Sequence, residues 1–204
     1  MRSKTFKIGI TGGIGSGKSL ISRIFSVFGV PVYDADSRAK WLLNNNSSLI
    51  ISVKNTFGEG AYTENHELDR EFISNIVFKD PSKLHTLNEL VHPLVANDFE
   101  EWANQNQNNF YVLKEAALIF ESGTDQALDK IINVSAPESL RIKRVLLRDI
   151  HRKKEQVQEI MDKQLKDEER KAKADFNITN DGTKLVIPQV WKLHQILRKL
   201  ESKG

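Results

Sequence analysis

A short stretch near the N-terminus has the residue types and spacing of a phosphate-binding loop. Gly12 to Ser19 read Gly-Gly-Ile-Gly-Ser-Gly-Lys-Ser, which satisfies G-x-x-x-x-G-K-[ST]. Glycines let backbone N–H groups turn inward around phosphate oxygens, and a helix that follows presents its positive N-terminus to the same anion. The Lys18 ammonium can reach the β- and γ-phosphates, and the Ser19 hydroxyl can bind Mg²⁺. The alternative is a glycine-rich turn that matches by chance.

The loop alone does not choose between a kinase, an ATPase and a GTP-dependent switch. A GTP-dependent switch normally carries Asn-Lys-x-Asp for guanine and Asp-x-x-Gly for the γ-phosphate. Neither pattern occurs in the chain. The sequence therefore argues against a GTP switch.

Two carboxylates, Asp34 and Asp36, follow the β-prone run Val30–Tyr33. In a doubly wound sheet the carboxyl ends of the strands line the ligand crevice, so both would lie near the phosphate loop. Residues i and i+2 of an extended chain point to the same side, so the two could converge on one site. One carboxylate could hold water around Mg²⁺, and the other could accept the proton of an attacking hydroxyl. Either could instead cap a helix that starts near Ser37.

A basic segment between Arg141 and Lys154 contains seven Lys or Arg residues and one acid, Asp149. Arg144, Arg148 and Arg152 are four residues apart, which predicts one helical face. Such a face can clamp a polyphosphate, or it can simply be solvated. Beside a phosphate loop we favour a mobile lid. Nucleic-acid binding is weakly indicated because aromatic residues are not interleaved with the charges.

The elements around these residues predict an α/β fold. Phe6–Thr11 is a strand, a helix starts at Lys18 and ends near Gly29, and 30–33 is a second strand, which is the opening of a parallel βαβ unit. The remaining strands are expected at 110–113, 130–134 and 176–179, and an amphipathic helix closes the chain at 185–200. The fold class predicted is a phosphate-loop NTPase-type parallel sheet flanked by helices, with a helical substrate-binding insertion and a helical lid.

The expected domains are a nucleotide-binding core (1–36, 108–144 and 174–204), a helical substrate domain (37–107) and a lid segment (145–173). Within the insertion, Asn44–Ser48 is expected to be a loop, and one helix is expected to begin at Pro81. His92-Pro93 is expected to begin a separate helix that runs to about Gln105.

Composition limits the remaining possibilities. The chain has 204 residues, of which 39% are hydrophobic and 28% charged, with a net charge of +3 and no cysteine. This excludes disulfides, thiolate metal sites and a cysteine nucleophile, and the charge is too small to indicate nucleic acid by itself. The five histidines lack metal-ligand spacing. With no apolar run long enough to span a bilayer and no signal-peptide core, we expect a cytoplasmic protein with no membrane or nucleic-acid partner.

The motifs together resemble those of the bacterial dephospho-coenzyme A kinase family. In family order over nearly the whole chain they are Ile10–Ser19, Val32–Asp36, Leu68–Arg70, Leu87-Asn88, His92–Leu94, Leu118–Gly123, Arg148-Asp149, Gln164, Ala174-Asp175 and Asn180–Gly182. The loop is generic, but its combination with Asp-Ala-Asp at this distance is specific. Leu20 stands where the family often has Thr, and Ala117 where it often has Pro.

The resemblance implies an ATP- and Mg²⁺-dependent kinase that phosphorylates the ribose 3′-hydroxyl of dephospho-CoA. It implies that Asp36 activates the hydroxyl, with Lys18 and Arg148 also catalytic and Arg148 acting from the lid. It further implies that Ser19 and Asp34 hold the metal. The nucleotide-binding set is Gly13, Ile14, Gly15, Ser16, Gly17, Lys18, Ser19 and Leu20. Such a protein is expected to be a monomer or a weak homo-oligomer.

Two alternatives stay open at this point. One is a kinase for another small molecule, such as a nucleoside monophosphate. The other is a nucleic-acid-binding or regulatory protein that uses ATP only as a switch. The Asp34 and Asp36 pair argues against the second, because a switch needs no base for a hydroxyl group.

Overall fold

The computed structural model describes residues 5–201, so residues 1–4 and 202–204 of the predicted core lie outside the described part. The chain divides into two compact units. The first combines Met1–Asp34 with Ala103–Gly204, and the second is the continuous stretch Ala35–Trp102. The elements that position the phosphate loop all belong to the first unit.

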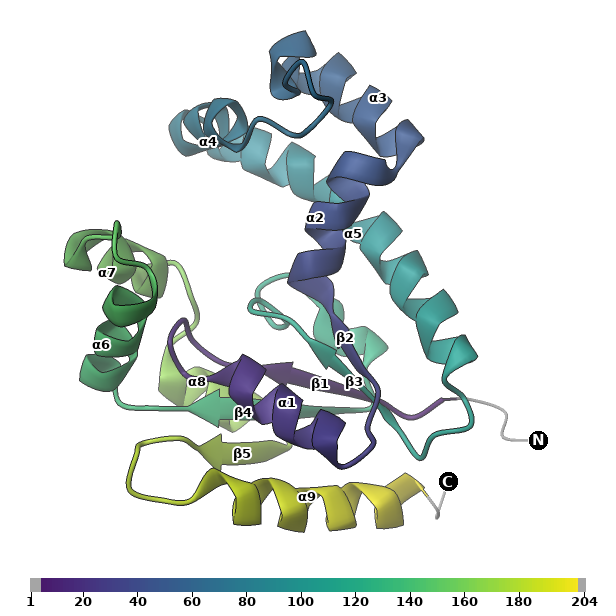
Figure 1. The fold of residues 1–204 in the computed structure, drawn as a ribbon, viewed down its shortest axis with the longest axis vertical. Coiled ribbons are helices and arrows are strands. Elements are labelled where there is room, and N and C mark those ends of the chain that lie inside the picture. Colours follow the sequence, from purple (N-terminus) through teal and green to yellow (C-terminus); the bar gives the residue numbers. More distant parts are fainter. Residues whose placement is uncertain (1–4, 202–204) are drawn as a thin grey trace. The chain divides into compact units, whose positions relative to one another are not determined.

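The first unit is built on a five-stranded parallel sheet with the strand order β2-β3-β1-β4-β5 (Figure 1). The strands are β1 (Lys7–Thr11), β2 (Val32–Asp34), β3 (Val112–Glu115), β4 (Lys130–Ser135) and β5 (Phe176–Thr179). The ends of all five strands lie within two residues of the ends of the predicted β-prone runs. Because the sheet is parallel, the carboxyl ends of all five strands meet at one edge.

The described part of the first unit contains five α-helices and a short 3₁₀ helix, η2 (Thr124–Ala127), between β3 and β4. The α-helices are α1 (Lys18–Val27), α6 (Glu138–Arg148), α7 (Lys154–Asp162), α8 (Asp167–Lys173) and α9 (Val186–Glu201). α1 and α9 contact each other beside the sheet, and α8 contacts β4. Ile8, Ile10, Phe25, Ile132 and Val190 are fully buried in the core between them.

The second unit is helical, as expected. It contains α2 (Ala35–Asn45), α3 (Ser47–Phe57), α4 (Arg70–Lys79) and most of the long α5 (Pro81–Gln105), with a short 3₁₀ turn, η1, at Glu59–Ala61. The predicted loop at Asn44–Ser48 is reduced to Asn46, whose side chain accepts the N–H of Leu49 and so caps α3.

The prediction that His92-Pro93 begins a separate helix is wrong. Pro93 lies inside α5, which runs without interruption from Pro81 to Gln105. A proline inside a helix removes one backbone N–H and so one hydrogen bond to the preceding turn, but it need not end the helix. Buried Val91, Val95 and Phe99 on either side of it pack in this unit and favour continuation.

No helix among residues 5–201 has both the length and the apolar character needed to cross a membrane.

One buried pair in the first unit gives a pH-dependent stability. His194 Nδ1 lies 2.7 Å from the hydroxyl of Tyr111, and both side chains are buried. Burial, aided by the charge of Arg198, lowers the pKa of His194 below its usual 6.5. In the unfolded chain the imidazole takes up a proton near pH 6.5, so below that pH the unfolded state binds more protons than the folded state.

We therefore expect the free energy of unfolding to fall as the pH drops below about 6.5 and to be fully retained above it. His194→Asn keeps a polar atom near Tyr111 but does not titrate, so its melting temperature should fall less between pH 7 and pH 5. His151→Asn, on the exposed segment after α6, is the control. Parallel pH profiles for the wild type and His194→Asn would contradict this assignment.

Candidate active site

The phosphate loop has a conformation that only glycine accommodates at two positions. Gly15 has φ +77°, and a Cβ there would lie 2.4 Å from the carbonyl oxygen of Arg141. Gly17 has φ +95° and occupies the N-cap of α1, where a Cβ would lie 2.3 Å from the Asn180 side-chain nitrogen. Within the loop, Ser16 N–H donates to the Gly13 carbonyl at 3.0 Å. The close approach of neighbouring segments, together with backbone strain, therefore accounts for both glycines.

Lys18 and Ser19 begin α1, as predicted. Lys18 Nζ donates to the Gly12 carbonyl oxygen at 2.9 Å, which holds the ammonium across the loop. Ser19 is exposed, and its hydroxyl donates to Glu115 Oε1 at 2.7 Å. The side chain of Leu20 is half-exposed, and its N–H is used in the first turn of the helix, donating to Gly17.

Two carboxylates lie at the edge of the sheet beside Ser19. Glu115 ends β3 and is the register partner of Asp34, which ends β2. Register partners on neighbouring strands project to the same face of a sheet. Carboxylate and hydroxyl oxygens suit Mg²⁺, which also keeps waters and binds substrate phosphates, so it does not need three protein carboxylates. No cluster of three His, Asp or Glu residues that could hold a metal ion occurs in residues 5–201. The donors Ser19, Glu115 and Asp34 fit a phosphate-bound Mg²⁺.

The expectation that Asp34 and Asp36 share one side of an extended chain is wrong. β2 ends at Asp34, and α2 begins at once with Ala35, so Asp36 lies in the first helical turn. A carboxylate in that turn is favoured by the positive end of the helix dipole. Because α2 starts at Ala35, two residues before the predicted start near Ser37, Asp36 lies inside the helix and is not its N-cap residue.

Helix α6 and the segment after β5 contact the loop through the side chains of Arg141, Arg144 and Asn180. Arg141 is 5% exposed, and its Nε donates to the Ile14 carbonyl at 3.1 Å. Arg144 donates to the carbonyl oxygen of Ser16 at 3.4 Å, and Asn180 Nδ2 donates to the same oxygen at 2.8 Å. Burial, followed by the nearby Arg170, lowers the pKa of Arg141. This guanidinium nevertheless stays charged.

The prediction that Arg144, Arg148 and Arg152 form one helical face is wrong for Arg152. Arg144 and Arg148 lie on the same helix, but Arg152 lies after its end. α6 ends at Arg148, and Asp149 stands at its C-cap. Arg148 is largely exposed and makes a forked pair with Asp149, through Nε at 2.9 Å and Nη2 at 3.0 Å. This hydrogen bonding raises the pKa of Arg148. Arg152 also contacts Asp149, at 3.5 Å.

The lid segment has more internal packing than its polar sequence indicates. Val145, Val157 and Met161 are buried together, with Ile14 of the phosphate loop packed against them. Although the segment is mainly polar and charged, these three apolar residues therefore form a small buried cluster across α6 and α7.

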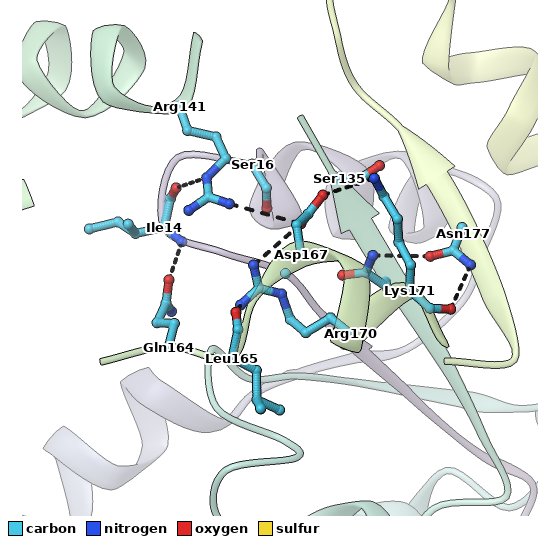
Figure 2. A network of polar contacts seen from close by, with 12 residues as sticks. Ile14, Ser16, Ser135, Arg141, Gln164, Leu165, Asp167, Arg170, Lys171 and Asn177 are labelled. Carbon is cyan, nitrogen blue, oxygen red and sulfur yellow. Dashed lines mark hydrogen bonds and ion pairs between the residues drawn. The ribbon is translucent and has the colours of Figure 1, made fainter. Parts of the chain in front are cut away.

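Polar contacts also tie the segment between α7 and α8 to the loop (Figure 2). Gln164 Oε1 accepts the Ile14 N–H at 2.8 Å. Arg170, 1% exposed, donates to the Leu165 carbonyl and to Asp167. A cavity of about 680 Å³ opens between this segment and the ends of β4 and β5, lined by Arg141 and Gln164 among others.

Sequence reasoning therefore missed Glu115, Arg141 and the contact made by Gln164. Glu115 had a usable signal, since it lies two residues after the β-prone run 110–113, much as Asp34 follows the run Val30–Tyr33. Arg141 was counted only as one charge of a basic segment. Its burial depends on the tertiary contact with the loop, which composition does not report.

Comparison with known proteins agrees with this geometry. Residues 6–185 match the family model described as dephospho-CoA kinase. The dephospho-CoA kinase of Porphyromonas gingivalis is 36% identical over 94% of each chain. Among solved structures, TT1252 from Thermus thermophilus superposes with a TM-score of 0.84 at 30% identity, covering 95% of this chain and 98% of that one. The dephospho-CoA kinase from Campylobacter jejuni gives 0.69 at 28% identity, covering 95% and 97%. With its phosphate loop, parallel sheet and these matches along its length, the chain belongs to the dephospho-CoA kinase family.

Proposed function

We propose that this protein transfers the γ-phosphoryl group of ATP to the ribose 3′-hydroxyl of dephospho-CoA, producing CoA and ADP. This is the last step of CoA biosynthesis. Family membership over residues 6–185 supports the reaction and favours it over a nucleotide-controlled switch. The observation that carries the proposal is the arrangement of Lys18, Ser19 and Glu115 at the carboxyl edge of the parallel sheet.

The residues divide into roles by their position. Backbone N–H groups of the loop would hold the triphosphate together with the Lys18 ammonium, except those of Ile14 and Ser16, which are bonded within the chain. Lys18 would also stabilise the charge that develops on the transferred group. Ser19, Glu115 and Asp34 would hold Mg²⁺, which when bound neutralises phosphate charge. Asp36 is proposed to orient the acceptor hydroxyl and take its proton late in a loose transition state. Arg148 is proposed to contact ATP from the lid segment, 145–173.

Competing substrates test the proposal directly. We expect ATP consumption and a product heavier by one phosphoryl group with dephospho-CoA, and far slower turnover with AMP, adenosine or shikimate. The phosphate should be located on the 3′-hydroxyl by phosphorus NMR. Preference for AMP would replace the proposal with the nucleoside monophosphate kinase alternative. A salt-dependent gel shift with nucleic acid, together with no transfer to any acceptor, would favour the switch.

The metal assignment gives a separate expected result. Asp34→Asn and Glu115→Gln should each raise the Mg²⁺ concentration needed for half-maximal turnover several-fold, because each removes a charged oxygen ligand. Melting curves recorded in EDTA should be close to those of the wild type. Glu155→Gln, at an exposed position on α7, is the matched control. Unchanged Mg²⁺ dependence in both variants would remove these carboxylates from the metal site.

A further inference from the structure

Every part of Ile14 is held by the chain that follows β4. Its carbonyl oxygen accepts from Arg141 Nε at 3.1 Å, and its N–H donates to Gln164 Oε1 at 2.8 Å. Its side chain packs against the buried cluster of Val145, Val157 and Met161. Ile14 lies at the tip of the phosphate loop, between Gly13 and Gly15. Through Gln164 and this apolar cluster, Ile14 is a point at which the loop contacts the lid segment.

Gln164 reaches the loop from a linker that is itself fixed. It lies between α7 and α8, and its own N–H donates to the Met161 carbonyl at 3.1 Å. The next residue, Leu165, donates its N–H to Glu121 Oε1 at 2.9 Å. With the backbone held on both sides, the Gln164 amide points at Ile14, as Figure 2 shows.

The residue type at this position fits its surroundings. An acceptor suits this position, because the Ile14 N–H is a donor in part-buried surroundings, where an unmade hydrogen bond is costly. A carboxylate would also accept this N–H, but it would place a negative charge at the rim of a loop that binds phosphates. A neutral amide supplies the acceptor without that repulsion.

We propose that Gln164 is a positioning residue: by accepting the Ile14 N–H it fixes the tip of the phosphate loop and couples nucleotide binding to the lid segment. Loss of this acceptor frees the peptide of Ile14 to turn, and the backbone N–H groups on either side lose their alignment toward the phosphates. Lys18 and Ser19, on α1, keep their own contacts. The inference rests on the proposed function in that the nucleotide is ATP.

The test uses a side chain of similar length that lacks the acceptor. Gln164→Met should raise the Kd and KM for ATP about tenfold while kcat at saturating ATP stays within about threefold, which is the loss expected from one unmade hydrogen bond. The matched control is Gln158→Met on α7, where the glutamine bonds Asp162 within its own helix. A general loss of stability would instead lower the melting temperature and reduce kcat and ATP affinity together.

Hydrogen exchange measures the coupling itself. In the wild type, saturating ATP should slow amide exchange in residues 153–164, and this protection should be largely absent in Gln164→Met at equal occupancy. Gln164→Glu retains an acceptor of the same length, so it should keep the protection while binding ATP more weakly. Unchanged ATP affinity and unchanged protection in Gln164→Met, or loss of protection in Gln164→Glu as complete as in Gln164→Met, would overturn the inference. A wild type that does not bind ATP would instead overturn the proposed function.

Discussion

Replacing Lys18 with alanine is expected to reduce turnover by ~10²-fold or more while the melting temperature stays close to that of the wild type. Lys18 is the first residue of α1, and its ammonium group reaches across the phosphate loop and donates to the Gly12 carbonyl oxygen at 2.9 Å. From that place it can follow the β- and γ-phosphates as charge develops during transfer. Coupled measurement of ADP formation at saturating ATP and acceptor checks the prediction.

The control for Lys18→Ala is Lys143→Ala, which removes the same group from an exposed position of α6. It should leave turnover within about twofold of the wild type, since an exposed lysine away from the reacting groups contributes little. Near-normal turnover of Lys18→Ala with an unchanged melting curve would contradict the proposal that this lysine stabilises charge on the transferred phosphoryl group.

Asp36→Asn is expected to lower turnover by ~10²- to 10⁴-fold, the range typical of a general base, while ATP affinity stays near normal. Asparagine keeps the shape of the side chain and removes its basicity, so the variant isolates proton acceptance from positioning. Stopped assays give kcat, and titration with a non-hydrolysable ATP analogue gives the affinity.

The rival for Asp36 is a purely structural role at the start of α2. The matched control is Asp69→Asn, because Asp69 is an N-cap whose side chain accepts the Phe72 N–H, and asparagine caps equally well. Asp69→Asn should be nearly silent. If Asp36→Asn were equally silent in turnover, Asp36 would be structural and the base would have to be sought elsewhere.

Much of the fold could be predicted because its signals are local. The run Phe176–Thr179 forms β5, and the helix expected at 185–200 is α9. Both could be predicted because the spacing of apolar residues within each segment indicates which face is buried. Pro93 shows the limit of this reasoning. A proline in the sequence indicates that one backbone N–H is missing. Whether the helix ends at that proline depends on what the two halves of the helix pack against, which the local sequence does not show.

The candidate site divides in the same way. The phosphate loop is one continuous stretch, so its chemistry could be read directly from its residues. Glu115 and Arg141 reach the same place from positions more than 90 residues further along the chain, and only the strand order and the path of α6 bring them to the loop. The prediction that Asp34 and Asp36 point to the same side was wrong for a local reason, since the backbone changes from strand to helix between them.

The strand order has a consequence for the order in which the chain becomes ordered during synthesis. Of the five strands, β1 leaves the ribosome first, yet both strands that pair with it, β3 and β4, are made after residue 111. Ala35–Trp102 is continuous, so all of its internal contacts are available before β3 exists. β1 therefore has no pairing strand while Ala35–Trp102 is translated. Asn180, which donates to the loop at Ser16, emerges later still. Of the five strands, the one synthesised first is thus among the last to complete its native contacts. During this long interval the exposed strand is open to aggregation or to chaperones.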